Sequence, residues 1–308
     1  MRKEGKLPSF SMERVDLKIG FLCNNRCQFC VQGNKRDFLP YKDLKEIRGD
    51  LKEAFRKGKR EVVLTGGEPS LHPDFLVIIG LAKSIGFKNI QVQTNGRMFA
   101  YEDFCLKTIK AGATEFSPAI HGHNAEIHDF LTTVKGSFNQ TVQGIKNLKK
   151  LNQRVLTNTV ITAKNYQYLP QIAQLLVDLN VDQFQFAFIH ISGRAAENKN
   201  WIVPRKNKIM PYVKKGLDIG IKAGKQVMIE AIPYCLMKGY EDYIAEKIIP
   251  EGSVFDIDFS IEDYGDYRRN KGKTKGPQCP ECKYYNICEG PWKEYPEIFG
   301  WKEFKPVK

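Results

Sequence analysis

Residues 15–30 read VDLKIGFLCNNRCQFC, and the interpretation of the whole chain starts from this stretch. Apolar and other residues alternate between Val15 and Phe21, which is the period of a β-strand. The strand leads to three cysteines, Cys23, Cys27 and Cys30, spaced C-x3-C-x2-C. Four thiolates normally hold a [4Fe-4S] cluster, so three would leave one iron open to another ligand. A structural zinc loop without its fourth ligand is the alternative, and the loop contains no histidine to complete it.

A regular alternation of strands and helices follows the cysteine loop. Apolar patterns predict strands at residues 15–21, 62–65, 90–94, 114–116, 155–161 and 183–188. Helical spacing occurs at residues 44–55, 102–110, 141–151 and 169–179, and in a segment that begins at residue 73. Strands that alternate with helices indicate a parallel sheet with right-handed crossovers. Six units predict an α/β fold of the partial (βα)6 TIM-like barrel type, with ligands at the carboxyl ends of the strands.

The pattern changes after about residue 200. A helix is predicted at residues 204–223 and a strand at residues 227–232, directly before Cys235. The tail at residues 256–308 is rich in Gly, Pro, Tyr and charge, and it has too few aliphatic residues to bury a core alone. We therefore expect residues 201–308 to be a small cysteine-rich C-terminal extension, ordered in part by a metal group.

Two motifs together resemble those of the radical S-adenosylmethionine (SAM) superfamily. Its C-x3-C-x-aromatic-C motif is matched by the cysteine loop with Phe29, and its Gly-Gly-Glu-Pro turn is matched after the second strand. The four residues of the turn are Gly66, Gly67, Glu68 and Pro69. The resemblance covers about residues 15–200 and implies that residues 1–200 form a radical SAM core. In that family the turn meets the SAM amino group, and Glu68 would offer it an acceptor.

The same resemblance implies a reaction. SAM would bind the open iron of the [4Fe-4S] cluster, and one electron would split it into methionine and a 5′-deoxyadenosyl radical. An external electron donor such as ferredoxin or flavodoxin is then expected. Three further residues are placed where relatives contact SAM: Asn95 after the third strand, Ser117 on the fourth and Asn158 on the fifth. The resemblance assigns no catalytic residue.

A second group of cysteines lies near the end of the chain. Cys279, Cys282 and Cys288 have the spacing C-x2-C-x5-C, with Cys235 upstream as a fourth ligand. This spacing resembles the core of the SPASM/twitch extensions of radical SAM enzymes, although Trp292 occupies the place of a further SPASM cysteine. Four thiolates suit one auxiliary [4Fe-4S] cluster in a shortened, twitch-like extension. Structural zinc is the alternative, because a C-x2-C knuckle also suits zinc.

Composition limits the location and the partners of the protein. No run approaches the ~20 apolar residues of a membrane span, and the N-terminal residues do not read as a signal peptide, so a cytoplasmic protein without a membrane partner is expected. The eighth cysteine, Cys105, lies on the apolar side of a predicted helix and is expected in the core. The net charge of +13 raises nucleic acid as a partner, but acids are interspersed among the lysines, so we regard nucleic acid as unlikely.

The function expected is that of a radical SAM enzyme whose deoxyadenosyl radical abstracts hydrogen from an unidentified substrate. A peptide is favoured and a small molecule comes next, because relatives with such extensions often modify ribosomally made peptides. The rival class is a non-catalytic iron-sulfur protein that serves as a redox sensor or binds RNA. The Gly-Gly-Glu-Pro turn distinguishes the two, because only the enzyme requires it.

Overall fold

The computed structural model describes residues 14–39, 41–248 and 252–308. Within them nine strands form one sheet, in the order β7-β6-β5-β4-β3-β2-β1-β8-β9. All neighbouring strands are parallel except β8 and β9. The strands are β1 (Arg14–Lys18), β2 (Glu61–Thr65), β3 (Asn89–Thr94), β4 (Glu115–Pro118), β5 (Arg154–Ile161), β6 (Gln183–Phe188), β7 (Gln226–Glu230), β8 (Gly252–Phe255) and β9 (Ser260–Ile261).

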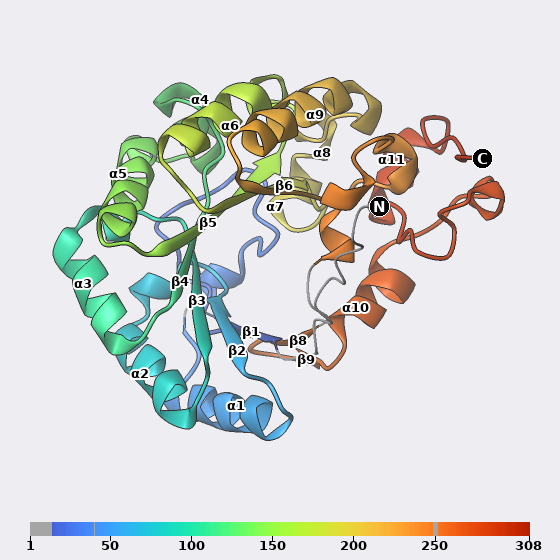
Figure 1. The fold of residues 1–308 in the computed structure, drawn as a ribbon. Coiled ribbons are helices and arrows are strands. Elements are labelled where there is room, and N and C mark those ends of the chain that lie inside the picture. Colours follow the sequence, from blue (N-terminus) through green and yellow to red (C-terminus); the bar gives the residue numbers. More distant parts are fainter. Residues whose placement is uncertain (1–13, 40, 249–251) are drawn as a thin grey trace, which may run out of the picture.

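Helices cover the outer side of this curved sheet, as Figure 1 shows. The helices are α1 (Leu44–Arg56), α2 (Phe75–Ile85), α3 (Glu102–Ala111), α4 (Ala125–Thr132), α5 (Ser137–Lys150), α6 (Leu169–Asp178), α7 (Arg194–Glu197), α8 (Lys199–Ile202), α9 (Lys206–Lys222), α10 (Tyr264–Tyr267) and α11 (Glu294–Phe299). A strand followed by a helix and a parallel strand recurs from β1 to β7, which is the architecture of an open, TIM-like barrel. None of the described helices is long and apolar enough to cross a bilayer.

The six strands predicted from the sequence are confirmed. The first is shorter than predicted, because the chain leaves the sheet after Lys18 and the backbone N–H of Phe21 donates to Leu39 O (3.1 Å). Helix α4 was not predicted, and it packs beside α5. Cys105 is fully buried in the core, as expected.

Alternation along the strands separates an apolar face from a polar one. Val15 and Leu17 are buried among the apolar core residues, whereas Asp16 and Lys18 lie on the opposite face. The pattern repeats across the sheet, where Leu17 and Leu64 are in register, as are Lys18 and Thr65. The apolar face therefore packs against the helices, and the polar face lines the inside of the curve.

Residues beyond 200 complete both edges of the sheet. Strand β7 pairs with β6, and β8 pairs with β1, from which it is separated by more than 230 residues of chain. Helix α10 lies at the open side of the curve (Figure 1). Burial raises the pKa of Tyr264 in this helix, and the nearby charges of Glu230 on β7 and Asp16 on β1 raise it further. Helix α10 thus lies at the open side of the curve (Figure 1), close to charges of both β1 and β7.

Candidate functional site: two groups of cysteines

The loop that carries Cys23, Cys27 and Cys30 follows β1 and is held by backbone hydrogen bonds from distant segments. Arg26 N donates to Thr132 O and Gln28 N donates to Leu131 O, both at 2.9 Å. Arg194 N, after β6, donates to Cys30 O at 2.9 Å. These bonds fix the loop at the carboxyl end of the sheet, where the sequence predicted it.

The three thiols of this loop share one environment. All three are free and partly buried. Burial raises the pKa of Cys23 to about 11, and burial together with the neighbouring Cys23 and Cys30 raises the pKa of Cys27. Cys23 Sγ accepts from Asn25 N (3.4 Å) and from Asn95 Nδ2 (3.9 Å). Three electrostatically coupled thiols on one short loop, with N–H donors to the sulfur of Cys23, fit the ligands of an iron-sulfur cluster, and iron would displace their protons.

No three His, Cys, Asp or Glu side chains of the described ranges converge on the position of a single metal ion. A [4Fe-4S] cluster takes one thiolate per iron, so its ligands surround a group of atoms and need not converge on one point.

The Gly-Gly-Glu-Pro turn lies directly against the start of the cysteine loop. Gly67 N donates to Gly20 O and Glu68 N donates to Leu22 O, both at 2.8 Å. A Cβ atom at Gly66 would lie 2.1 Å from Gly20 O, and one at Gly67 would lie 2.3 Å from Phe21 O. The glycines are therefore required by contact with the chain itself, in addition to any role toward a ligand.

Glu68 is buried, and both of its carboxylate oxygens accept hydrogen bonds from the chain. Its Oε1 accepts from Ser70 N (3.1 Å) and Thr94 Oγ1 (2.7 Å), and its Oε2 accepts from Asn95 N (2.6 Å). Burial raises the pKa of this carboxyl, while the hydrogen bonds oppose that shift. Glu68 thus joins the turn after β2 to the end of β3, a role that the sequence did not reveal. Pro69 is buried at the start of the short 3₁₀ helix Pro69–Leu71.

Asn95 links this turn to the cysteine loop. Its Nδ2 donates to Asn24 Oδ1 at 2.6 Å, besides its contact with Cys23 Sγ. Arg97, which sequence reasoning missed, donates to Asn24 O (2.5 Å) and to Asn25 Oδ1 (2.9 Å). The signal for Arg97 was its place in the segment Asn95-Gly96-Arg97, but nothing in the sequence pairs it with a loop 72 residues away.

Ser117 and Asn158 lie farther along the sheet, on its polar face. Ser117 is in register with Gln93, and Asn158 is in register with Gln185. Asn158 Oδ1 is buried and has no hydrogen-bond partner within the described residues. The structure therefore places both residues inside the curve of the sheet, without a contact that assigns either to a ligand.

Two histidines after β4 are buried beneath the cysteine loop, although the polar sequence around them favours solvated side chains. The ring of His121 packs edge-on against Phe29 with 4.6 Å between centroids, and it stacks on His128 at 5.7 Å. Burial lowers the pKa of His121, and it lowers the pKa of His128 to about 4. His128 Nδ1 accepts from His121 N at 3.1 Å, which requires this nitrogen to be unprotonated.

The four other cysteines of the sequence prediction come together at the C-terminal end of the chain. Cys235, Cys279, Cys282 and Cys288 line one cavity, whose other walls include Pro233, Trp301 and Phe304. Burial raises the pKa of Cys235 to about 12, and the other three thiols add to the effect. Cys105 is not part of this group, as expected.

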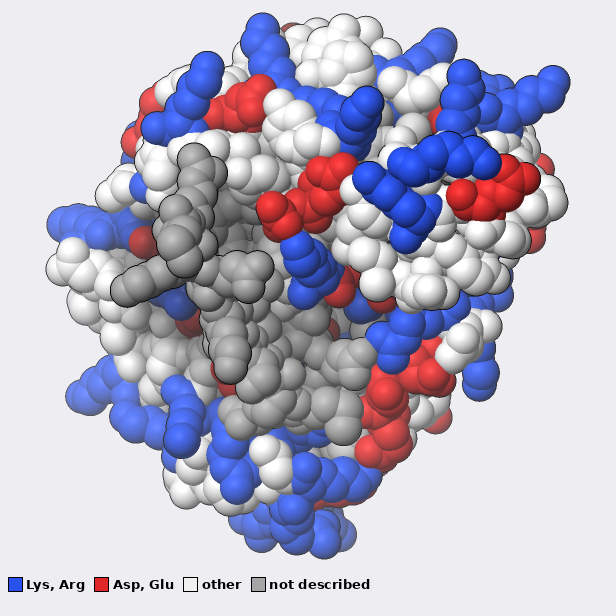
Figure 2. All heavy atoms as spheres, turned by 45° about the vertical axis from the view of Figure 1, so that its right-hand side comes forward, with Lys and Arg blue, Asp and Glu red and all other residues white. Residues whose placement is uncertain are grey.

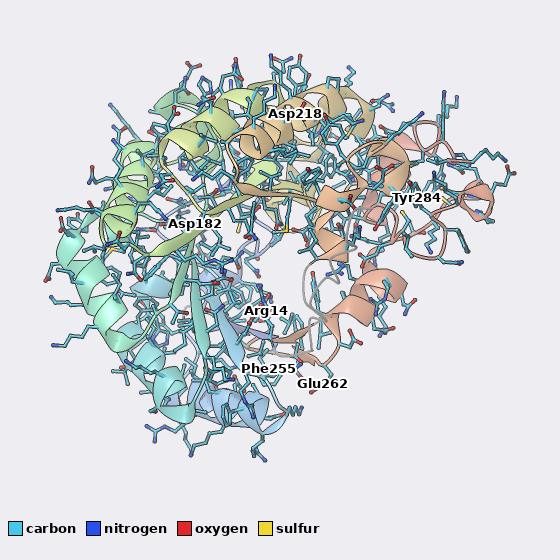
Figure 3. The ribbon with its side chains drawn as sticks, in the orientation of Figure 1. Arg14, Asp182, Asp218, Phe255, Glu262 and Tyr284 are labelled. Atoms are coloured by element: carbon cyan, nitrogen blue, oxygen red, sulfur yellow. The ribbon has the colours of Figure 1, made fainter. Side chains whose placement is uncertain are left out.

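Backbone N–H groups point at these C-terminal thiols. Gly276 N donates to Cys279 Sγ (3.3 Å) and Val307 N donates to Cys282 Sγ (3.4 Å). Tyr284, labelled in Figure 3, supports the same loop, because its carbonyl accepts from Cys288 N at 2.8 Å. Four thiols with amide donors in an apolar cavity fit an iron-sulfur cluster, and they also fit zinc.

A buried ionic network connects this cysteine group to the barrel. Lys273, which is 1% exposed, donates to Glu246 Oε1 and to Glu289 Oε2 (2.7 Å), next to Cys288. Arg268 binds both oxygens of Glu289 at 2.7 and 2.8 Å. Glu246 Oε1 also accepts from Ala231 N at the end of β7 (2.8 Å). No sequence pattern pointed to this network, since its members are spread over 59 residues without a motif.

Comparison with known proteins gives consistent results. A family model described as the Radical SAM superfamily matches residues 17–176. A probable GTP 3′,8-cyclase of Sulfurisphaera tokodaii is 29% identical over 184 residues, which cover 59% of this chain and 58% of the relative. An AdoMet-dependent heme synthase of Methanosarcina barkeri is 29% identical over 57% of this chain and 50% of its own length. The match thus spans only about half the length of these curated relatives.

Two solved structures share the fold over nearly the whole chain. Streptococcus suis SuiB, bound to the precursor peptide SuiA, aligns with a TM-score of 0.68 at 15% identity over 96% of this chain and 74% of its own. The structure of anSMEcpe with bound AdoMet aligns with a TM-score of 0.64 at 14% identity over 91% of this chain and 89% of its own. At these identities the likeness concerns the fold.

Proposed function

The chain belongs to the radical SAM superfamily, and from this premise we propose that it binds a [4Fe-4S] cluster through Cys23, Cys27 and Cys30 and cleaves SAM reductively. When bound and reduced, the cluster supplies the electron that splits SAM into methionine and a 5′-deoxyadenosyl radical, which abstracts hydrogen from the substrate. The observation that carries the proposal is the direct contact of the cysteine loop with the Gly-Gly-Glu-Pro turn, through Gly67 N and Glu68 N.

The residues of the chain would hold and orient these groups. Three thiolates leave one iron for the amino and carboxylate groups of SAM. Glu68 keeps the glycine turn and Asn95 in fixed positions, and Asn95 and Arg97 hold the loop between the first two cysteines. Asn158, with its unpartnered Oδ1 inside the curve, is available to accept a hydrogen bond from SAM or substrate.

The test is SAM cleavage by protein reconstituted anaerobically with iron and sulfide. With dithionite as reductant, the protein should form 5′-deoxyadenosine, detected by chromatography. As a control variant, Cys105→Ala removes a thiol of the apolar core and should still form 5′-deoxyadenosine. Absence of 5′-deoxyadenosine from fully loaded protein would show that the proposal is wrong.

We also propose that Cys235, Cys279, Cys282 and Cys288 hold an auxiliary [4Fe-4S] cluster in a twitch-like extension at residues 201–308. The support is the convergence of four thiols on one cavity. The variant with Cys23, Cys27 and Cys30 all changed to Ala tests this point by metal analysis. Iron that remains identifies an auxiliary cluster, whereas zinc alone identifies a structural site.

A peptide is the substrate class that the comparisons favour. The likeness to the peptide-bound SuiB structure covers the part of the chain after residue 200, whereas the cyclase and heme synthase matches cover less than 60% of the chain. Extract fractions separated by size should be added to the reconstituted protein with SAM. A peptide fraction should accelerate 5′-deoxyadenosine formation; acceleration by the small-molecule fraction alone would reject this substrate class.

The rival function is a non-catalytic iron-sulfur protein that binds RNA or senses redox state. On the face shown in Figure 2, Lys and Arg side chains are interspersed with Asp and Glu side chains. Mixed charge of this kind gives little support to a nucleic-acid surface. Tight, steeply salt-dependent RNA binding by a protein that does not cleave SAM would favour the rival.

A further inference from the structure

A hollow rich in arginine lies on the solvent side of the N-terminal cysteine loop, which otherwise faces the Gly-Gly-Glu-Pro turn. We call it the arginine hollow, and its lining residues are Arg26, Gly33, Asn34, Arg36, Asp37, Thr133, Arg194 and Glu197. It is separate from the apolar cavity of the C-terminal cysteines. Nothing in the proposed SAM chemistry uses its side chains.

The walls of the arginine hollow are attached to the backbone of the ligand cysteines. The Arg36 guanidinium donates to Cys23 O (3.2 Å) and to Asn25 O (2.7 Å). Arg194 N donates to Cys30 O (2.9 Å), and the Arg194 guanidinium donates to Arg26 O (2.8 Å). A protein seated in the hollow would therefore be separated from the cluster ligands only by the loop backbone.

The arginine hollow carries net positive charge, and one of its arginines has no side-chain partner among the described residues. Asp37 and Glu197 oppose the three arginines, so the lining carries a net positive charge. Arg26 is exposed, and within the described residues its guanidinium forms no hydrogen bond or ion pair, unlike those of Arg36 and Arg194. A free guanidinium directly before Cys27 is suited to pair with a carboxylate of a partner.

Exposed apolar side chains lie around the same loop. Val31, directly after Cys30, is 43% exposed, and Phe130 and Trp201 are 44% and 42% exposed. Phe130 and Trp201 contact each other, with 6.0 Å between ring centroids. Both elements touch the loop, because Leu131 O accepts from Gln28 N and Asn198 Nδ2 donates to Gln28 O. Apolar area beside a few charges is typical of small, transient electron-transfer interfaces.

We propose that the arginine hollow, with Val31, Phe130 and Trp201 at its edge, is the docking surface for an acidic one-electron carrier protein of the flavodoxin type. This inference rests on the proposed function, because each SAM cleavage consumes one electron from outside. The reduced carrier would lose one electron, its hydroquinone flavin becoming the semiquinone, and the cluster would gain it. Opposite charge would speed the encounter, and the small interface would allow rapid release.

The experiment compares two reductants on one reconstituted protein. The probe is a flavodoxin kept reduced by NADPH and its reductase, and dithionite is the small reductant that needs no docking. Arg26→Glu should slow flavodoxin-driven 5′-deoxyadenosine formation by about tenfold at low salt, while the dithionite-driven rate stays unchanged. Arg26→Lys, which keeps the charge, should retain most of the rate. Lys222→Glu, the same charge change at the exposed end of α9, should leave both rates unchanged.

Binding gives a readout that does not depend on activity. Oxidised flavodoxin should bind the reconstituted protein in calorimetry, and Arg26→Glu and high salt should each weaken that binding by about tenfold. Equal rates and affinities for Arg26→Glu and Lys222→Glu would overturn the docking site. A loss with both reductants would also overturn it, since Arg26 would then serve the SAM site. Lack of cleavage by the wild-type protein with dithionite would instead reject the proposed function.

Discussion

The two groups of cysteines in this chain differ in number, surroundings and attachment. The N-terminal group has three thiols, and side chains that include Asn95 and Arg97 hold its loop. The C-terminal group has four thiols in an apolar cavity, with backbone N–H groups directed at Cys279 and Cys282. Three ligands leave a cluster open to an incoming molecule, whereas four close it. The comparison suggests a reactive group at one end and an electron-storing or structural group at the other.

The largest difference should appear when one ligand is removed from each group. We expect Cys27→Ala to abolish 5′-deoxyadenosine formation, because the reactive cluster would lose a ligand in its loop. Cys282→Ala should keep dithionite-driven cleavage of SAM within about threefold of wild type, since distant sites act independently. Iron analysis would show that each variant loses only its own group. Equal loss of SAM cleavage in the two variants would contradict the assignment of separate roles.

The next effect concerns the buried ionic network beside the C-terminal group. Lys273→Met would leave Glu246 and Glu289 without their shared cation in a buried place, and we expect a loss of about 3–5 kcal/mol in the free energy of unfolding. Lys271→Met, an exposed lysine on the same segment, is the matched control and should be neutral. Urea unfolding measures both variants. An equal effect of the two substitutions would show that the network does not stabilise the extension.

These two groups also show what the sequence could and could not reveal. Motif spacing located six of the seven ligand candidates, because cluster chemistry needs thiols at short, fixed intervals. Cys235 lies far upstream of its group and was named only as a cysteine available to complete four ligands. Apolar patterns predicted the six parallel strands, by alternation in the first strand and by a short apolar run in the second. Strand β8 was missed, because it is four residues long and its partner β1 lies more than 230 residues earlier in the sequence. The hydrogen bonds that Glu68 accepts from Thr94 and Asn95 were also missed, because a sequence motif identifies a residue but not the distant residues that it contacts.

The third effect is a dependence on pH beneath the N-terminal loop. Burial lowers the pKa of His128 from 6.5 to about 4, so the folded protein keeps this ring neutral where the unfolded chain takes up a proton. The stabilisation is present above pH 6.5 and is lost as the pH falls toward 4, by up to about 3 kcal/mol in the free energy of unfolding. Unfolding in urea at pH 7 and pH 4.5 measures this loss. His128→Asn, whose Oδ1 can replace the acceptor Nδ1, should make the loss smaller, and the buried His121 should contribute to the part that remains. An unchanged slope would exclude a contribution from His128.

The smallest effect concerns the hydrogen bonds of Asn95, which hold the loop of the N-terminal group and do not involve the C-terminal group. Asn95→Ala removes the bond from Nδ2 to Asn24 Oδ1 and the bond that Oδ1 accepts from Arg97 N, and we expect a loss of about 1 kcal/mol in the free energy of unfolding. The loss should be local, because the C-terminal thiols have backbone donors that no side-chain truncation removes. A chelator should therefore take iron faster from the N-terminal group of Asn95→Ala and at an unchanged rate from the C-terminal group. Asn200→Ala, at an exposed position, is the control. Equally faster loss of iron from both groups of Asn95→Ala would mean that the two cysteine groups are not stabilised independently.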